Sequence, residues 1–250
     1  MNNGELQAFT HRRSDDFMAH YRRAQKKYDE IWRKYNNSMP ACIAKCSRIG
    51  ESLFADRDGP QGIYWIGEEP KILFAGREHF GWYGSSEWPT DMERICFSPL
   101  EFAYHAVPSM GSYWNVIKEI ISDVLQVDIS DWDSVLREIA ITNACKCFSD
   151  KKTYQWQLHQ NCLEQSYLSY ELEVINAPVN VLFTKAYGLC SKIFHDARVH
   201  QDDNEFLVVE SSGKYIIECA HPGRQSHEWR LALKEKISYY LQVGKNTRYV

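Results

Sequence analysis

Long apolar runs are missing from this chain of 250 residues. No stretch approaches the roughly 18 to 20 apolar residues that are needed to cross a bilayer, so no membrane partner is expected. The amino-terminal residues MNNGELQAFTHRR also lack the apolar core of a signal peptide. The sequence therefore predicts a cytoplasmic protein.

An excess of basic residues is missing too, because 29 lysines and arginines stand against 33 acidic residues and the net charge is −4. Bulk charge gives no reason to expect a nucleic-acid partner, so local groups must recognise any such partner. No Gly-x-Gly-x-x-Gly or phosphate-loop motif follows the first predicted strand, which argues against an ordinary nucleotide-binding enzyme. No convincing cluster of metal-binding carboxylates indicates a nuclease.

The composition that remains is that of a packed protein, with 44% hydrophobic, 14% aromatic and 25% charged residues. It excludes disordered, collagen-like and low-complexity classes. Because neither a repeat nor a linker is visible, residues 1–250 are expected to form one domain. Residues 14–37 predict an amphipathic helix packed on it, whose basic face is either solvated or in contact with phosphate. Its apolar stripe consists of Phe17, Tyr21, Ala24, Tyr28, Ile31 and Tyr35.

Four short apolar runs predict buried strands, and helical patterns, such as 113–127 and 156–175, lie between them. This alternation predicts an α/β fold, a three-layer α/β/α sandwich around a small central sheet of four parallel strands. The polar residues 199–212 are expected to lead into one extra strand or into the fourth strand. The four runs lie at 71–76, 138–144, 180–185 and 214–220.

Polar residues follow three of these predicted strands. Glu78 supplies a carboxylate, Asn143 an amide and His221 an imidazole. Each has an ordinary explanation when taken alone, such as a helix cap for Asn143 or a hydrogen-bonded loop histidine for His221. Because the carboxyl ends of parallel strands meet at one edge of a sheet, the three together favour a functional site there.

The order of these segments resembles that of the uracil-DNA glycosylase superfamily, over about residues 42–229. Members carry a Gly-Gln-Asp-Pro-Tyr-like or Gly-Glu-Ala-Pro-Gly-like motif after the first strand, an Asn-bearing motif after the second and His-Pro-Ser after the fourth. The resemblance implies a monomeric, monofunctional DNA glycosylase for base excision repair that flips a base out of DNA, with uracil as the default substrate. The matching segments here are Gly76-Arg77-Glu78-His79-Phe80, Thr142-Asn143, His221-Pro222-Gly223 and, for the aromatic ring that stacks on the base, Ile95-Cys96-Phe97-Ser98.

The resemblance also implies a role for each residue. Glu78 would orient water and stabilise positive charge on the sugar, and His221 would hydrogen-bond the base O2; these two are the catalytic residues. Asn143 would read the base edge, because a side-chain amide complements uracil N3-H and O4. The other implied contacts are Phe97, Phe80, Arg77 and His79 to the base, and Arg224, Gln225 and Lys146 to DNA.

The cysteine spacing is similar to that of the iron-sulfur branch of this family. The resemblance implies a 4Fe-4S cluster bound by two separated cysteine pairs, Cys42 with Cys46 and Cys147 with Cys162. Cys145 is a competing ligand, and a structural zinc ion or buried thiols are alternatives to the cluster. Three further cysteines lie in apolar stretches and are expected in the core, namely Cys96, Cys190 and Cys219.

The motifs differ from the family pattern at several positions, which leaves room for a base other than uracil. Arg77 stands where Gln is common, His79 replaces Pro, Phe80 replaces Tyr and Gly223 replaces Ser. One alternative is a glycosylase for a bulkier modified base, for example in phage DNA during host defence. Another is a catalytically inactive DNA-binding protein of the same fold, although the three retained polar residues favour an enzyme.

Overall fold

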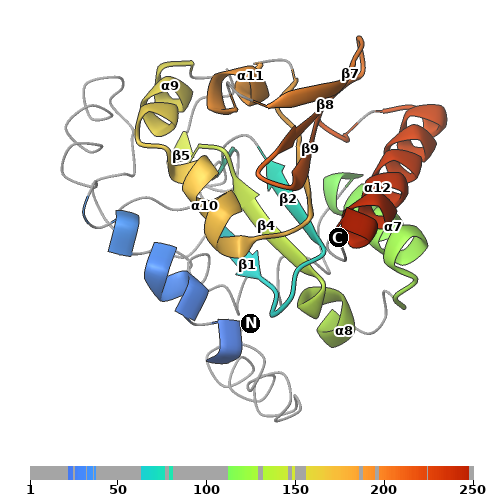
Figure 1. The fold of residues 1–250 in the computed structure, drawn as a ribbon, viewed down its shortest axis with the longest axis horizontal. Helices are drawn as coiled ribbons and strands as arrows, with labels where there is room; N and C mark the ends of the chain where they lie inside the picture. The colour runs from blue at the N-terminus through green and yellow to red at the C-terminus, as the bar shows by residue number, and fades with distance from the viewer. Residues whose placement is uncertain are drawn as a thin grey trace, which may run out of the picture.

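A wide central sheet with helices on both faces forms the body of the protein (Figure 1). Among the helices described, none combines the length and the apolar composition that crossing a lipid bilayer requires. The computed structural model describes residues 22–24, 26–31, 33–35, 37, 63–76, 79–80, 112–128, 132–145, 148–149, 156–185, 188–194, 197–223 and 225–247.

Four parallel strands form the centre of the sheet, in the order β4-β2-β6-β9. They lie at the four apolar runs, so the expectation of an α/β fold with parallel central strands is confirmed. Nearly all their side chains are buried, because helices cover both faces, and this explains why the runs are continuously apolar rather than alternating. Their bounds are β2 Ile72–Gly76, β4 Ile139–Asn143, β6 Val179–Leu182 and β9 Lys214–Cys219.

The sheet has seven strands, so the prediction of a four-stranded sheet was wrong. Strand β1 (Ile63–Ile66) pairs antiparallel with β4, and the hairpin of β7 (Arg198–Asp202) and β8 (Phe206–Ser211) pairs antiparallel with β9. Residues 199–212 therefore contribute to two strands rather than to one. Strand β7 lies at the sheet edge, and because its side chains are mostly polar and exposed it forms no apolar run in the sequence.

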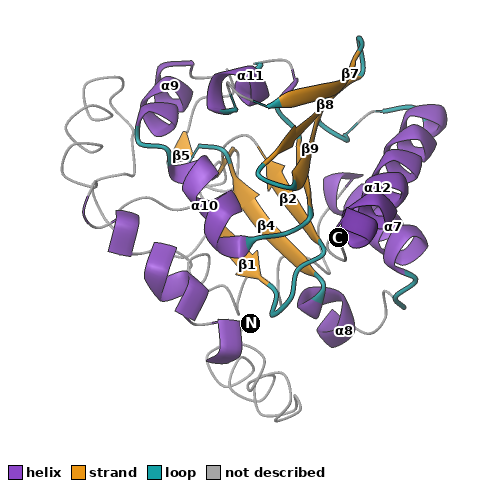
Figure 2. Ribbon diagram, viewed as in Figure 1, coloured by secondary structure: helices purple, strands orange, loops and turns teal. Residues whose placement is uncertain are grey.

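Two hydrophobic clusters fill the spaces between the sheet and its helices. Figure 2 shows the helices on the two sides of the sheet. Helices α7 (Ser112–Leu125) and α12 (His227–Thr247) cover one face. Helices α9 (Trp156–Glu164), α10 (Tyr167–Ile175) and α11 (Leu189–Ile193) contribute to the cluster on the other face. A short helix, α8 (Trp132–Arg137), leads into β4.

The pattern over 156–175 forms two helices rather than one. Ser166 lies between α9 and α10 with φ of 56°, a left-handed conformation that ends regular helix geometry. The amino-terminal helix, described between residues 22 and 37, packs on the same cluster as α9 and α10 through Ala24, Tyr28, Ile31 and Tyr35. The Ile66 N-H also donates a hydrogen bond to the Tyr28 hydroxyl at 2.5 Å, which attaches this helix to β1.

Candidate functional site

The candidate site lies at the carboxyl ends of the four parallel strands. Strand β2 pairs with β4 on one side and with β6 on the other, so the chain passes from β2 to β4 in one direction across the sheet and from β4 to β6 in the opposite direction. Such a switch point opens a crevice outside the carboxyl ends, and α/β proteins bind ligands there. The site predicted from the sequence therefore lies where this topology favours ligand binding.

The segments that follow β2 and β4 run side by side beyond the main sheet. Gly76 is in register with Asn143, and the Ala144 N-H donates a hydrogen bond to the Gly76 carbonyl at 2.9 Å. Farther along, β3 (His79–Phe80) pairs in parallel with β5 (Phe148–Ser149). Two of the sequence motifs are thus brought together by their backbones.

Asn143 is the last residue of β4 and is 7% exposed. The preceding residue, Thr142, donates a hydrogen bond from its hydroxyl to Glu171 Oε2 on α10 at 2.7 Å. Burial raises the pKa of the Glu171 carboxyl well above its usual range. This Thr142-Glu171 pair lies in the interior and anchors the end of β4 directly before the proposed base-reading amide.

His221 is exposed in the loop after β9, and local hydrogen bonds shape this loop. The Gly223 N-H donates to His221 Nδ1 at 3.1 Å, and Gln225 Nε2 donates to the His221 carbonyl at 2.9 Å. Because Nδ1 accepts a hydrogen bond, the neutral imidazole carries its proton on Nε2. The ring therefore presents an N-H donor at Nε2, and Gln225 contributes to holding the loop.

Asn143 and His221 lie on opposite sides of the switch point. Strands β2 and β6 separate β4 from β9, so the two strand ends are about 14 Å apart at a spacing of about 4.8 Å per strand. For His79 and Phe80 the structure describes only the backbone. The remaining predicted contacts lie outside the described residues, namely Glu78, Arg77, Phe97, Arg224 and Lys146.

Two buried cysteines are neighbours in the fold. Cys145 Sγ and Cys162 Sγ are 3.8 Å apart. A tetrahedral metal ion with metal-sulfur bonds of about 2.3 Å holds two thiolates about 3.8 Å apart, so this pair fits as two ligands of one metal centre. Cys145, the competing ligand, thus lies beside Cys162, whereas Cys42, Cys46 and Cys147 are outside the described residues.

Two other cysteines are ordinary core residues, as their apolar surroundings predict. Cys190 and Cys219 are fully buried. Burial, with a contribution from the charge of Glu218, raises the pKa of the Cys190 thiol to about 12, and the same two causes raise the pKa of Cys219. Both remain neutral thiols at neutral pH, which makes them poor metal ligands. Cys96 is outside the described residues.

Sequence reasoning missed two charged residues near this edge. Glu218, buried in β9, accepts three hydrogen bonds on Oε1, from the Thr184 hydroxyl at 2.7 Å, Leu189 N at 2.8 Å and Cys190 N at 3.1 Å. A single acidic residue within the apolar run of β9 is the sequence feature that could have identified Glu218 as a buried, hydrogen-bonded group. Lys185 was predicted as the last residue of the third strand, 180–185, whereas β6 ends at Leu182 and Lys185 lies beyond it.

A scan against protein-family models and a comparison with curated proteins both found no match. Support for a function therefore consists of the motif order and the geometry at the carboxyl ends of the parallel strands. That geometry places Asn143, His221 and Gln225 at the carboxyl ends of the parallel strands.

The stability of the fold is expected to depend on the proton of Glu171. Because the folded protein keeps a proton that the unfolded chain releases above a pKa of about 4.3, the free energy of unfolding should fall as the pH rises above that value. Glu171→Gln should flatten this dependence in urea titrations at several pH values. Glu173→Gln, which removes an exposed carboxyl from the same helix, should leave it unchanged. Identical slopes for wild type and Glu171→Gln would contradict this assignment.

Proposed function

We propose that the protein is a DNA glycosylase that hydrolyses the N-glycosidic bond of a base flipped out of DNA, with uracil as the default substrate. One observation carries the proposal. Asn143 and His221 stand on the two sides of the switch-point crevice, and β2, which ends two residues before Glu78, lies between them. The side chains that such a reaction needs therefore belong to the carboxyl ends of strands of one parallel sheet.

The proposed roles of Asn143 and His221 follow from the hydrogen bonds that a flipped base offers. The Nε2-H of His221 donates to the base O2 and stabilises the negative charge that develops as the base leaves. The Asn143 amide accepts from N3-H and donates to O4, a combination that uracil and thymine offer and that cytosine, with an acceptor at N3 and a donor at N4, does not. Removing the base from the stack costs a few kcal/mol, and these contacts together with stacking on Phe97 offset that cost.

The Glu78 carboxylate supplies the remaining chemistry in this proposal. It orients a water molecule, accepts a proton from it as the water oxygen bonds to the sugar C1′, and stabilises the positive charge on the sugar. The bond from C1′ to the base breaks, and the base leaves as an anion with the bonding electron pair. No covalent lysine intermediate is needed, because the three motifs contain no lysine apart from Lys146. Phe80, Arg77 and His79 line the base pocket, and Arg224, Gln225 and Lys146 contact DNA.

The proposed protein is a three-layer α/β/α domain of the glycosylase type with a 4Fe-4S cluster bound by Cys42, Cys46, Cys147 and Cys162. The cluster would have a structural role, linking the amino-terminal segment to the loop and helix after β4. The position of Cys162, buried beside another sulfur, supports a metal centre here. The same contact makes a single ion bound by Cys145 and Cys162 the rival centre.

Base release tests the proposed activity. Wild-type protein should release a base from oligonucleotides that contain uracil, hypoxanthine, xanthine or modified cytosines. His221→Ala should slow this release by a factor on the order of 100 to 1,000, as loss of one oxyanion-stabilising donor does. His200→Ala is the matched control, because His200 is an exposed histidine on β7 that pairs with Glu210.

Equal rates for His221→Ala and wild type would refute the mechanism. Tight DNA binding without release of any base would instead support the inactive DNA-binding alternative. A protein-DNA adduct trapped with borohydride would contradict hydrolysis without a lysine intermediate.

Metal analysis tests the proposed cluster. Protein purified without oxygen should contain about four iron and four labile sulfide per chain. Cys162→Ser should lose them, whereas Cys190→Ser, a buried control, should keep them. One zinc per chain, lost in both Cys145→Ser and Cys162→Ser, would replace the cluster with a single-ion site. Protein without any bound metal would refute both.

A further inference from the structure

A lysine stands at the carboxyl end of β6, beside the switch point. Lys185 lies three residues after the end of this strand. Among the described loop residues directly after β2, β4, β6 and β9, before the next helix or strand begins, Lys185 is the one lysine or arginine. The sequence motifs did not single it out, so the candidate site has a cationic group that the proposed mechanism does not use.

The backbone on both sides of Lys185 is fixed. Before it, the Phe183 N-H donates to the Ala75 carbonyl at 3.0 Å, and after it, the Gly188 N-H donates to the Lys185 carbonyl at 3.1 Å. Thr184, the residue directly before Lys185, donates its hydroxyl to the buried Glu218 carboxylate at 2.7 Å. Lys185 therefore extends from a rigid support, which limits the entropy that it loses when it binds a ligand.

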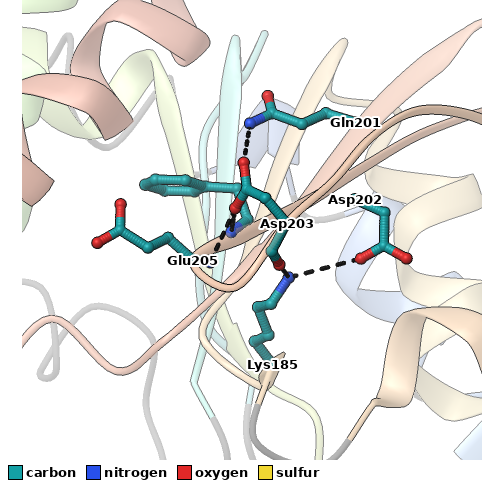
Figure 3. A network of polar contacts seen from close by, with 6 residues as sticks. Lys185, Gln201, Asp202, Asp203 and Glu205 are labelled. Carbon is teal, nitrogen blue, oxygen red and sulfur yellow. Dashed lines mark hydrogen bonds and ion pairs between the residues drawn. The ribbon is translucent and has the colours of Figure 1, made fainter.

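The Lys185 side chain reaches the turn between β7 and β8 (Figure 3). Its ammonium donates a hydrogen bond to the Asp203 backbone carbonyl, which carries no net charge. The Asp202 carboxylate oxygen Oδ1 is 3.9 Å from the ammonium nitrogen, which is too long for a hydrogen bond. Side-chain exposure is 72% for Asp202 and 19% for Lys185. A solvated ion pair of this kind contributes about 0 to 1 kcal/mol, so a ligand can displace Asp202.

The turn holds the Asp203 carbonyl in place independently of Asp202. Asp203 Oδ1 accepts hydrogen bonds from Glu205 N at 2.8 Å and from Phe206 N at 2.7 Å. The side-chain amide of Gln201 donates to the other carboxylate oxygen. The Asp202 side chain can therefore move away while the Lys185 ammonium keeps its hydrogen bond to the Asp203 carbonyl and stays in the same position.

We propose that Lys185 binds a phosphate of the DNA backbone at the candidate site, and that Asp202 is the counter-ion that this phosphate displaces. The inference rests on the proposed function, because it takes DNA as the ligand. A phosphate has the charge and the acceptor oxygens to replace a carboxylate on an ammonium that retains an unused N-H. The contact positions DNA at the crevice without reading its sequence.

The salt dependence of DNA binding tests this inference. The probes are single-stranded and duplex oligonucleotides with ordinary bases, so that no base release is required. Lys185→Gln should lower the slope of log Kd against log salt by about one, and should weaken binding roughly eightfold at about 0.1 M salt. Lys185→Arg should retain the wild-type slope. Asp202→Asn should strengthen binding about twofold, but only when Lys185 is present.

Lys71→Gln is the matched control. Lys71 forms an ion pair with Glu138 at 2.5 Å. It directly precedes β2, so it lies at the amino ends of the parallel strands, away from the candidate site. Lys71→Gln changes the net charge equally and should leave the slope unchanged. An equal loss of slope in both variants, or no loss in Lys185→Gln, would overturn the phosphate contact while the proposed function stands. Wild-type protein that binds neither probe would refute the proposed function itself.

Discussion

The parallel pairing of β2 with β4 and with β6 is the constraint on which the candidate site depends. Both pairings continue at the strand ends, through the hydrogen bonds from Ala144 N to Gly76 and from Phe183 N to Ala75. Because β2 is held from two sides and buried on both faces, its carboxyl end cannot shift without breaking the sheet. The position of the candidate site is therefore set by backbone hydrogen bonds and core packing.

Two buried threonine-glutamate pairs support this edge in the same manner. Thr142 donates to Glu171, and Thr184 donates to Glu218, each at 2.7 Å. Each threonine directly precedes a proposed functional residue, Asn143 in the first case and Lys185 in the second. A buried carboxyl costs free energy unless it is hydrogen-bonded, and in each pair the threonine hydroxyl supplies such a bond.

The sequence predicted the parts of the molecule that depend on continuous burial. The four central strands were found because both their faces are apolar, and Asn143 and His221 were found because they follow such strands. The edge strand β7 was missed because its side chains are exposed. The roles of Glu218 and Lys185 were missed because their partners, such as the Leu189 N-H and the Asp203 carbonyl, are backbone groups that only the folded chain brings near. The contact between Cys145 and Cys162 depends on the fold in the same way.

A crystal structure of the protein bound to duplex DNA would test whether a flipped base binds between Asn143 and His221. The DNA would carry, at the target position, a 2′-fluorinated deoxyuridine that resists hydrolysis. We expect the uracil to lie outside the helix stack between Asn143 and His221, with O2 within hydrogen-bond distance of His221 Nε2. A uracil that remains stacked, or DNA bound away from the carboxyl ends of β2, β4, β6 and β9, would contradict this expectation.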